Sequence, residues 1–386
     1  MNPYGRLVLP AIAIVVLLSA CGGRNAGSTS RILIGGNVIG APLDLAGNVT
    51  TSSGDGSQGA IDCTVGTGAS FDFPEGIATD GINLFIADSQ NHTIRKMAIS
   101  TGAVTTVAGT AYVPGATDCT VGAGATFNFP SGITTDGTNL YVADTNNHSI
   151  RKIVISTGAT TTIAGDHTVA GYSDGAGAAA HFNFPRGITS AGTSLFVADG
   201  DNHLIRKVVI ATGTVTTIAG DNAAVSPVPG YSDGTGTAAK FAWPSAITTD
   251  GSNLYVTDTD NHLVRKIVIA TGAVTTVAGD NSSIPPYGGD PPIYSDGVGS
   301  AARFSSPAGI ATDGTNLYVS DTGNNLVRKI AIATREVTTV AGDNNVNGFA
   351  DGTGTAAHFS FPSGIATDGV NLFVGDRNNN RIRKIR

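Results

Sequence analysis

Aspartate and histidine recur at fixed places in a repeated segment of the chain, and both side chains are common metal ligands. The aspartates are Asp88, Asp144, Asp199, Asp258, Asp321 and Asp376. Histidines follow four residues later in four of the repeats, as His92, His148, His203 and His262. Equivalent positions in separate repeats lie far apart, so they cannot meet around one calcium or zinc ion. We therefore predict turn-capping roles for these residues, and we assign no metal ligand and no catalytic residue.

An Arg-Lys pair also occurs once in each repeat, and these pairs take up 12 of the 22 basic residues. A basic face of this kind could bind RNA. The formal net charge of −7 and the pI near 5.4 argue against a nucleic-acid partner. We expect the aliphatic stems to pack between repeats and the charged heads to pair with repeat aspartates.

The elements that would hold these residues come from one segment present in six copies. The copies begin at Phe71, Phe127, Phe182, Phe241, Phe304 and Phe359, and the proline three residues later recurs every 55 to 63 residues. This period, with runs rich in Val, Ile and Thr, is typical of a propeller or a solenoid rather than of a disordered Gly-rich chain. In the second copy the pattern predicts four strands. They cover residues 132–135, 140–143, 150–156 and 159–164.

The two ends of the repeat region predict that the repeats close into a ring. The sixth copy stops at Arg386, after its third strand, and residues 46–51 resemble the fourth strand that it lacks. Closure would also remove the open sheet edges that a solenoid must cap. We predict that Val49 lies beside Ile382 and Ile385 and completes the last sheet.

The runs Asn202-His203-Leu204 and Asn261-His262-Leu263, in the setting PxGIxTxxxxLxVADxxNHxIRK, resemble the NHL repeat. The resemblance covers about residues 46–386, although copies five and six carry Asn325 and Asn380 in place of the histidine. It implies an all-β fold, a six-bladed β-propeller of four-stranded antiparallel blades. Related six-bladed propellers include lyases and lactonases that hold a metal in the central channel.

We expect function where the copies differ, because residues shared by all blades serve the fold. The residue before the Phe and the residue after the Pro vary between copies. Both lie at the entry to the first strand, which lines the central channel in propellers. The candidate binding face consists of Glu75, His181, Arg186, Lys240, Arg303 and His358. An ordinary solvated rim is the alternative. In an enzyme, His181 and His358 with Glu75 could supply metal ligands.

Pro-rich connectors between copies carry tyrosines. Residues 222–231 and 281–294 contain Tyr231, Tyr287 and Tyr294, which could form a contact surface for a partner. Surface loops without a partner are the alternative.

Cys63 and Cys119 each stand eight residues before the Phe of a copy, in neighbouring repeats. They form a possible disulfide if the chain is exported to an oxidising compartment. Matching positions in adjacent blades approach within bonding distance only near the axis.

The N-terminus predicts export to the bacterial cell envelope. An apolar run over residues 7–18 precedes Leu18-Ser19-Ala20-Cys21, which resembles the lipobox of bacterial lipoproteins. Residues 1–20 would be a lipoprotein signal peptide, Cys21 the lipidation site and residues 21–45 a flexible tether to the membrane. A plain signal peptide with a chance cysteine is the alternative.

Together these features predict a lipid-anchored, extracytoplasmic binding or scaffold protein that is not an enzyme. The partner would be a protein, peptide or glycan, and no cofactor is predicted. The sequence contains no nucleophile elbow, HExxH motif or phosphate loop. The alternative function is a metal-dependent lyase or lactonase-like enzyme with its site in the central channel.

Overall fold

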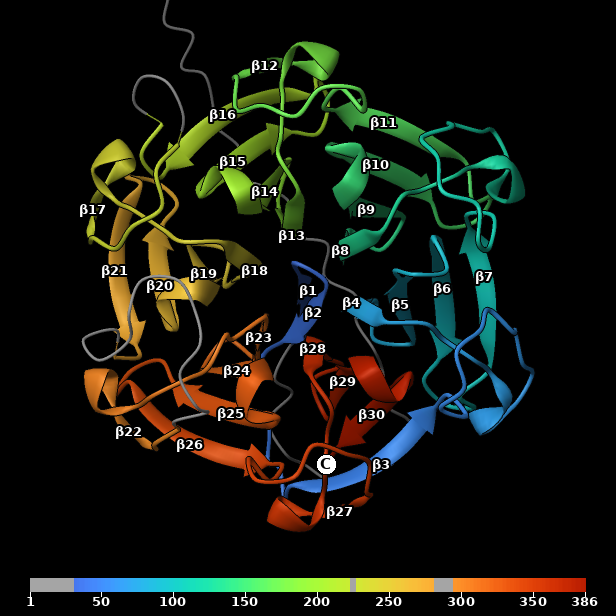
Figure 1. Ribbon diagram of the computed structural model, residues 1–386, viewed down its shortest axis with the longest axis vertical. Helices are drawn as coiled ribbons and strands as arrows, with labels where there is room; N and C mark the ends of the chain where they lie inside the picture. Colours follow the sequence, from blue (N-terminus) through green and yellow to red (C-terminus); the bar gives the residue numbers. More distant parts are fainter. Residues whose placement is uncertain (1–30, 223–226, 281–293) are drawn as a thin grey trace, which may run out of the picture.

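The computed structural model describes residues 31–222, 227–280 and 294–386, and Figure 1 shows six sheets arranged as blades around one axis. Blades 1 and 2 consist of β4 (Pro74–Thr79), β5 (Asn83–Asp88), β6 (Thr93–Ala98), β7 (Val104–Ala108), β8 (Pro130–Thr135), β9 (Asn139–Asp144), β10 (Ser149–Val154) and β11 (Thr160–Ala164). Blades 3 and 4 consist of β13 (Pro185–Ala191), β14 (Ser194–Asp199), β15 (Leu204–Val209), β16 (Thr214–Ala219), β18 (Pro244–Thr249), β19 (Asn253–Asp258), β20 (Leu263–Val268) and β21 (Ala273–Ala278). Blades 5 and 6 consist of β23 (Gly309–Thr312), β24 (Asn316–Asp321), β25 (Leu326–Ala331), β26 (Glu336–Ala341), β28 (Pro362–Thr367), β29 (Leu372–Asp376), β30 (Arg381–Ile385) and β3 (Asn48–Ser53). The predicted six-bladed, all-β propeller is confirmed.

Short elements complete the blades. Blades 3 to 6 each gain a two-residue edge strand, namely β12 (Gly175–Ala176), β17 (Gly234–Thr235), β22 (Gly297–Val298) and β27 (Gly352–Thr353). Short 3-10 turns precede the inner strands at η1 (Gly66–Gly68), η2 (Gly122–Gly124), η4 (Gly177–Ala179), η6 (Gly236–Ala238), η8 (Gly299–Ala301) and η10 (Gly354–Ala356). Others follow the second strands at η3 (Thr145–Asn147), η5 (Gly200–Asn202), η7 (Thr259–Asn261), η9 (Thr322–Asn324) and η11 (Arg377–Asn379). Over the described ranges, no helix is long and apolar enough to span a membrane.

A separate hydrophobic core lies between each pair of adjacent blades. Phe85 of blade 1, for example, shares a core with Phe127, Leu140 and Val142 of the next repeat. Because each blade is covered on both faces, its second strand is a continuous apolar run, and Leu140 and Val142 are fully buried.

The ring is closed by strand β3, which lies at the outside of blade 6 against β30 (Figure 1). Val49 is paired with Ile385 and Ser53 with Ile382 in an antiparallel register, and Val49 is fully buried. The predicted closure is confirmed, because the N-terminal strand supplies the backbone partner that β30 would otherwise lack.

A hairpin of β1 (Ile32–Ile34) and β2 (Asn37–Ile39) lies at the centre of the ring (Figure 1). It contacts the ends of the inner strands: Thr79 of β4 donates its N–H to the Gly36 carbonyl, and Asn37 accepts the N–H of Thr367 from β28. Asn37 also donates to Thr248 of β18. Residues 31–45, which the sequence analysis assigns to the tether, are therefore instead packed against the ring over much of their length. The hairpin fills one mouth of the channel.

Glycine keeps the channel narrow at its other mouth. A Cβ atom on Gly76 would collide with the carbonyl oxygen of Ser131 in the next blade, and one on Gly132 would collide with that of Arg186. The same close approach recurs at Gly309 and Gly364. The second residue after the proline is thus glycine in five blades because backbone approaches backbone there.

Candidate functional site

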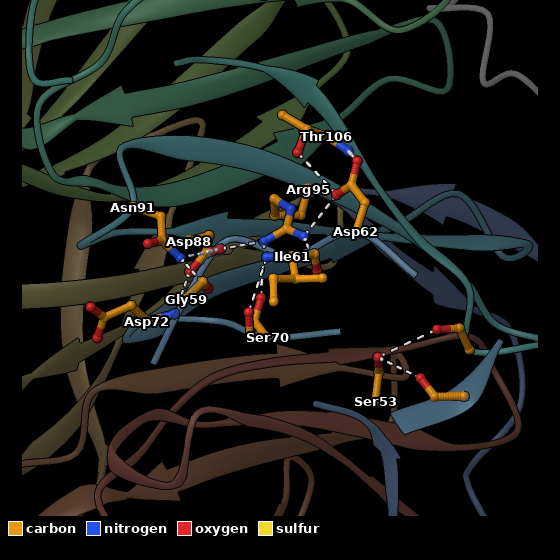
Figure 2. A network of polar contacts seen from close by, with 12 residues as sticks. Ser53, Gly59, Ile61, Asp62, Ser70, Asp72, Asp88, Asn91, Arg95 and Thr106 are labelled. Carbon is orange, nitrogen blue, oxygen red and sulfur yellow. Dashed lines mark hydrogen bonds and ion pairs between the residues drawn. The ribbon is translucent and has the colours of Figure 1, made fainter. Parts of the chain in front are cut away.

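Arg95 is the centre of a buried network that Figure 2 shows. Its side chain is fully buried, and Nη1 donates to Asp88 at 2.7 Å while Nη2 donates to Asp62 at 2.8 Å. The same nitrogens donate to the carbonyl oxygens of Ser70 and Ile61. The other blades repeat this arrangement with the triads Arg151–Asp144–Asp118, Arg206–Asp199–Asp174, Arg265–Asp258–Asp233, Arg328–Asp321–Asp296 and Arg383–Asp376–Asp351. The predicted pairing of repeat arginine with repeat aspartate is confirmed.

The carboxylate of the repeat aspartate accepts hydrogen bonds from groups of its own blade. Asp88 accepts the backbone N–H of Asp72 at 2.8 Å and the side-chain amide of Asn91 at 2.8 Å, besides the bond from Arg95. Burial raises the pKa of Asp88 to about 6, and the charge of Arg95 opposes that rise. The carboxylate is therefore still ionised at neutral pH and serves as a turn cap. In the part of the chain that the structure describes, no three His, Cys, Asp or Glu side chains are grouped to hold a metal.

The repeat histidines connect one blade to the next. His92 Nδ1 accepts the backbone N–H of Phe129 in the following repeat at 3.0 Å, and Asn325 Oδ1 accepts that of Phe361 at 2.9 Å. The equivalent pairs are His148–Phe184, His203–Trp243, His262–Ser306 and Asn380–Phe73. Each acceptor and each donor has a positive φ, between 45° and 58°. Sequence reasoning excluded a metal role but missed this bond, although asparagine in two copies indicated a hydrogen-bond acceptor.

Only two of the six residues of the predicted binding face lie at the channel mouth. Glu75 and Arg186 line a pocket at the channel mouth. His181, Lys240, Arg303 and His358 do not line it. Lys240 is paired with Asp221 at 3.1 Å, Arg303 with Asp280 at 3.1 Å, and His181 is hydrogen-bonded to Ser173. His358 exchanges backbone hydrogen bonds with Ala350. The metal-ligand set of His181, His358 and Glu75 is therefore not brought together.

The pocket lies on the side of the channel opposite the N-terminal hairpin. It has a volume of about 130 Å³ and is lined by the first residues of the inner strands from every blade. The residues after the six prolines form its rim: Glu75, Ser131, Arg186, Ser245, Ala308 and Ser363. Clefts and cavities that bind drug-sized ligands are larger, about 300–1,000 Å³, so this mouth suits the tip of a ligand.

Arg377 also lines the pocket and is a site residue that sequence reasoning missed. Its Nε lies 3.2 Å from Glu75 Oε1, and its Cζ lies 4.8 Å from the centroid of the Phe73 ring. In the same way, Cζ of Arg186 lies 4.7 Å from the ring centroid of Trp243. Each arginine is thus stacked on the aromatic residue that precedes a proline in the next blade.

The signal for Arg377 lies in one position of the repeat. The residue after the turn aspartate is Ser or Thr in four blades, where its hydroxyl donates to the carbonyl of the next blade's proline at 2.6 to 2.7 Å. The other two blades have Gly200 and Arg377 there. The two blade junctions that carry the stacked arginines therefore lack this hydrogen bond from a hydroxyl to the proline carbonyl.

Two of the three predicted contact tyrosines, Tyr231 and Tyr294, lie in the described part of the chain, and each is exposed beside a repeat arginine. Tyr231 lies over Arg265 of blade 4, with its ring centroid 5.4 Å from Cζ, and Tyr294 lies over Arg328 of blade 5 at 5.6 Å. Both rings cover the repeat arginines of their own blades. Tyr287 lies outside the described residues.

Cys63 and Cys119 are both free thiols. The backbone of Cys63 forms an isolated antiparallel β-bridge with Val104 of the outer strand β7. The backbone of Cys119 forms the same kind of bridge with Thr160 of the outer strand β11. The possible disulfide between them is not formed, because matching positions on the outer strands of neighbouring blades lie away from the axis. Cys21 and the signal segment lie outside the described residues.

Two curated relatives resemble the chain in sequence. Protein SUPPRESSOR OF QUENCHING 1 of Arabidopsis thaliana is 30% identical over 329 residues, which cover 81% of this chain and 30% of that protein. NHL repeat-containing protein 2 of Homo sapiens is 28% identical, covering 67% of this chain and 39% of that protein. The chain therefore spans less than half the length of these two relatives.

Solved structures share the fold. A structural genomics protein of unknown function from Bacteroides thetaiotaomicron superposes with a TM-score of 0.64 at 22% identity, covering 88% of this chain and 75% of that one. An auxiliary nutrient binding protein from the same organism has a TM-score of 0.63 at 17% identity, covering 88% and 76%. A streptogramin B lyase has a TM-score of 0.51 at 14% identity, covering 89% and 99%. At these identities the likeness concerns the fold alone.

Family models match the chain directly. The model of the NHL repeat matches residues 127–153, and the model of the teneurin NHL domain matches residues 151–386. The chain belongs to the teneurin NHL domain family of NHL-repeat β-propellers.

Proposed function

We propose that this propeller is a non-catalytic binding protein that takes the tip of a protein, peptide or glycan ligand into the pocket at the channel mouth. The observation that carries the proposal is the split between shared and variable residues. The shared Asp, Arg and His side chains are occupied within and between blades, whereas Glu75, Arg186 and Arg377 differ from their counterparts and converge at the pocket. Charged groups that depart from the repeat at one concave site are typical of a ligand site.

The form of the channel supports a site at one end only. The hairpin of residues 32–39 fills the opposite mouth, and Gly36, Asn37 and Gly40 are hydrogen-bonded to the ring there. Two structural neighbours, from Bacteroides thetaiotaomicron and Bacteroides ovatus, are auxiliary nutrient binding proteins. A binding role for this chain is consistent with those neighbours. The placement of His181 and His358 gives no support to the metal-dependent enzyme.

The proposal includes the cellular address. The sequence Leu18-Ser19-Ala20-Cys21 after an apolar run supports lipidation of Cys21 and anchoring to the bacterial envelope, facing away from the cytoplasm. Its test is the variant Cys21→Ser expressed as the full chain in a bacterium. We expect the wild type in the membrane fraction with incorporated fatty acid, and the variant without the label. Membrane retention and labelling of Cys21→Ser would contradict the anchor.

The ligand site is tested by filling the mouth. Full-length protein would be screened against glycan and peptide arrays, together with Ala308→Trp, which places a large side chain on the pocket rim. Thr315→Trp is the matched control, because Thr315 is exposed in a turn at the hairpin side of blade 5. We expect Ala308→Trp to abolish a signal that Thr315→Trp retains. Equal signals from both variants, or no ligand on either array, would contradict the proposed site.

A further inference from the structure

Two arginine–aromatic pairs face each other across the pocket. Arg186 lies on Trp243 at the junction of blades 3 and 4, and Arg377 lies on Phe73 at the junction of blades 6 and 1. These junctions are opposite one another in the ring (Figure 1). Both arginines line the same pocket, so the mouth presents two guanidinium groups from opposite sides.

The two guanidinium groups differ in their polar partners. Arg377 forms an ion pair with Glu75. The side chain of Arg186 has no hydrogen bond or ion pair to any residue that the structure describes, and its buried Nε lacks a partner. The buried indole Nε1 of Trp243 beside it lacks one as well. Nε of Arg377 and of the repeat arginines lacks a hydrogen bond too, but the repeat arginines have their Nη atoms paired with aspartates. The Nη atoms of Arg186, which lines the pocket, are the donors left for the acceptor of a ligand.

The surroundings of Arg186 restrict the charge of that ligand. Asp201 in η5 and Asp260 in η7 lie within electrostatic reach of Arg186: burial raises the pKa of each carboxyl, and the charge of Arg186 opposes the rise. With Glu75 beside Arg377, three carboxyl groups near the mouth outnumber the two arginines by one, although only Glu75 lines the pocket itself. A multiply charged anion such as phosphate would meet repulsion that a single carboxylate meets less.

We infer that the mouth binds a carboxylate-bearing ligand end, held by the unpaired donors of Arg186 with Arg377 opposite and with Trp243 and Phe73 beside it. The inference rests on the proposed function and names its ligand chemistry. A planar guanidinium matches a carboxylate bidentately. The volume of about 130 Å³ is below that of pockets for drug-sized ligands, so the mouth accepts the carboxylate end of a ligand and not a whole large molecule. Such a group could come from an acidic sugar or from the C-terminus of a peptide.

Trp243 is the only tryptophan of the chain and stacks on Arg186, so its fluorescence reports on the site. Full-length protein would be titrated with galacturonate and with N-acetyl-dialanine, each against its methyl ester, and with inorganic phosphate. We expect a saturable change in fluorescence with one or both free carboxylates. The matching methyl ester should bind at least about tenfold more weakly. Response to galacturonate alone assigns a saccharide source, and response to the dipeptide alone assigns a peptide source.

The variants make the result specific. Arg186→Gln should weaken carboxylate binding by roughly tenfold to a hundredfold. Arg303→Gln, which removes an arginine outside the pocket, should retain it. Unfolding curves for both variants check that each is folded.

Three results would overturn the inference: equal binding of acid and ester, tighter binding of phosphate, or unchanged binding by Arg186→Gln. Absence of any response up to about 10 mM ligand would overturn it as well, because a dissociation constant of that size corresponds to a binding free energy of only about −3 kcal/mol. A ligand without a carboxylate that Ala308→Trp blocks would leave the proposed function intact while removing this inference.

Discussion

His262 Nδ1 accepts the backbone N–H of Ser306 at 2.9 Å, across the junction between blades 4 and 5. The bond holds Ser306 at φ 45°, a left-handed conformation that L-residues with side chains seldom adopt. The residue after Ser306 is the proline that starts an inner strand. The histidine of the NHL motif therefore sets the position of the next blade at the channel mouth, and an unprotonated acceptor nitrogen is what the bond needs.

Acid should weaken these junctions. Burial lowers the pKa of His262 below its ordinary value of 6.5. The unfolded chain then binds this proton more readily than the folded chain, so stability falls as the pH falls below about 6.5. In His262→Asn, which copies the asparagine of blades 5 and 6, this contribution is absent. Between pH 7 and pH 5 the wild type should lose up to about 2 kcal/mol more than the variant, because each pH unit contributes at most ~1.4 kcal/mol.

Urea unfolding at the two pH values measures this difference. His167→Asn is the control, because His167 is exposed and makes no junction bond, and it should keep the wild-type pH dependence. Comparing variant with wild type removes the contribution of Asp258, whose pKa burial raises to about 6 and whose effect has the opposite sign. Identical pH dependence in wild type and His262→Asn would refute the role of the junction.

Removal of a repeat arginine should be strongly destabilising. Arg95→Met keeps much of the apolar stem but leaves the fully buried Asp88 carboxylate without its cation. Breaking one partner of a buried pair costs about 3–5 kcal/mol. The neighbouring Lys96→Met should cost less than about 1 kcal/mol, because Lys96 is only half-buried. Free energies of unfolding from denaturant titration compare the two.

A double variant separates the lost ion pair from lost packing. Asp88→Asn in the Arg95→Met background removes the unpaired charge and should recover part of the stability. No recovery would mean that packing around Arg95, and not its charge, holds the blade.

Closure of the ring depends on Val49. This side chain is fully buried at the point where β3 pairs with β30, so Val49→Asp places a carboxylate in the core between blades 5 and 6 and should cost more than about 3 kcal/mol. Thr50→Asp, on the exposed side of the same strand, is the matched control and should be nearly neutral. Thermal and urea unfolding of both variants measure the effect. Similar stability of the two would show that β3 is not essential to closure.

Ring closure was accessible from the sequence because Val49 stands in a segment that repeats the missing fourth strand. The hairpin of residues 32–39 was not, since that segment has no counterpart in the repeats and its place depends on contacts with inner strands far along the chain. Only part of the candidate site could be predicted from the sequence. Arg186 was found because it follows a proline at the start of an inner strand. His181 is only five residues earlier, but the chain there runs inward from the outer loops, so the two side chains reach different places.

The channel is narrow where Gly364 of blade 6 meets the backbone of Glu75 in blade 1. A methyl group on Gly364 would collide with the Glu75 carbonyl of blade 1, and backbone cannot yield there without moving one blade against another. Gly364→Ala should therefore destabilise the protein by about 1–3 kcal/mol, the usual cost of overpacking. Gly348→Ala is the matched control: an added Cβ would be 3.9 Å from its nearest neighbour, in ordinary contact. Urea unfolding should rank Gly364→Ala well below both the wild type and Gly348→Ala. Blade 4 already carries Ala246 at the equivalent position, so a neutral Gly364→Ala would show that the junction of blades 6 and 1 can adapt to a methyl group as well.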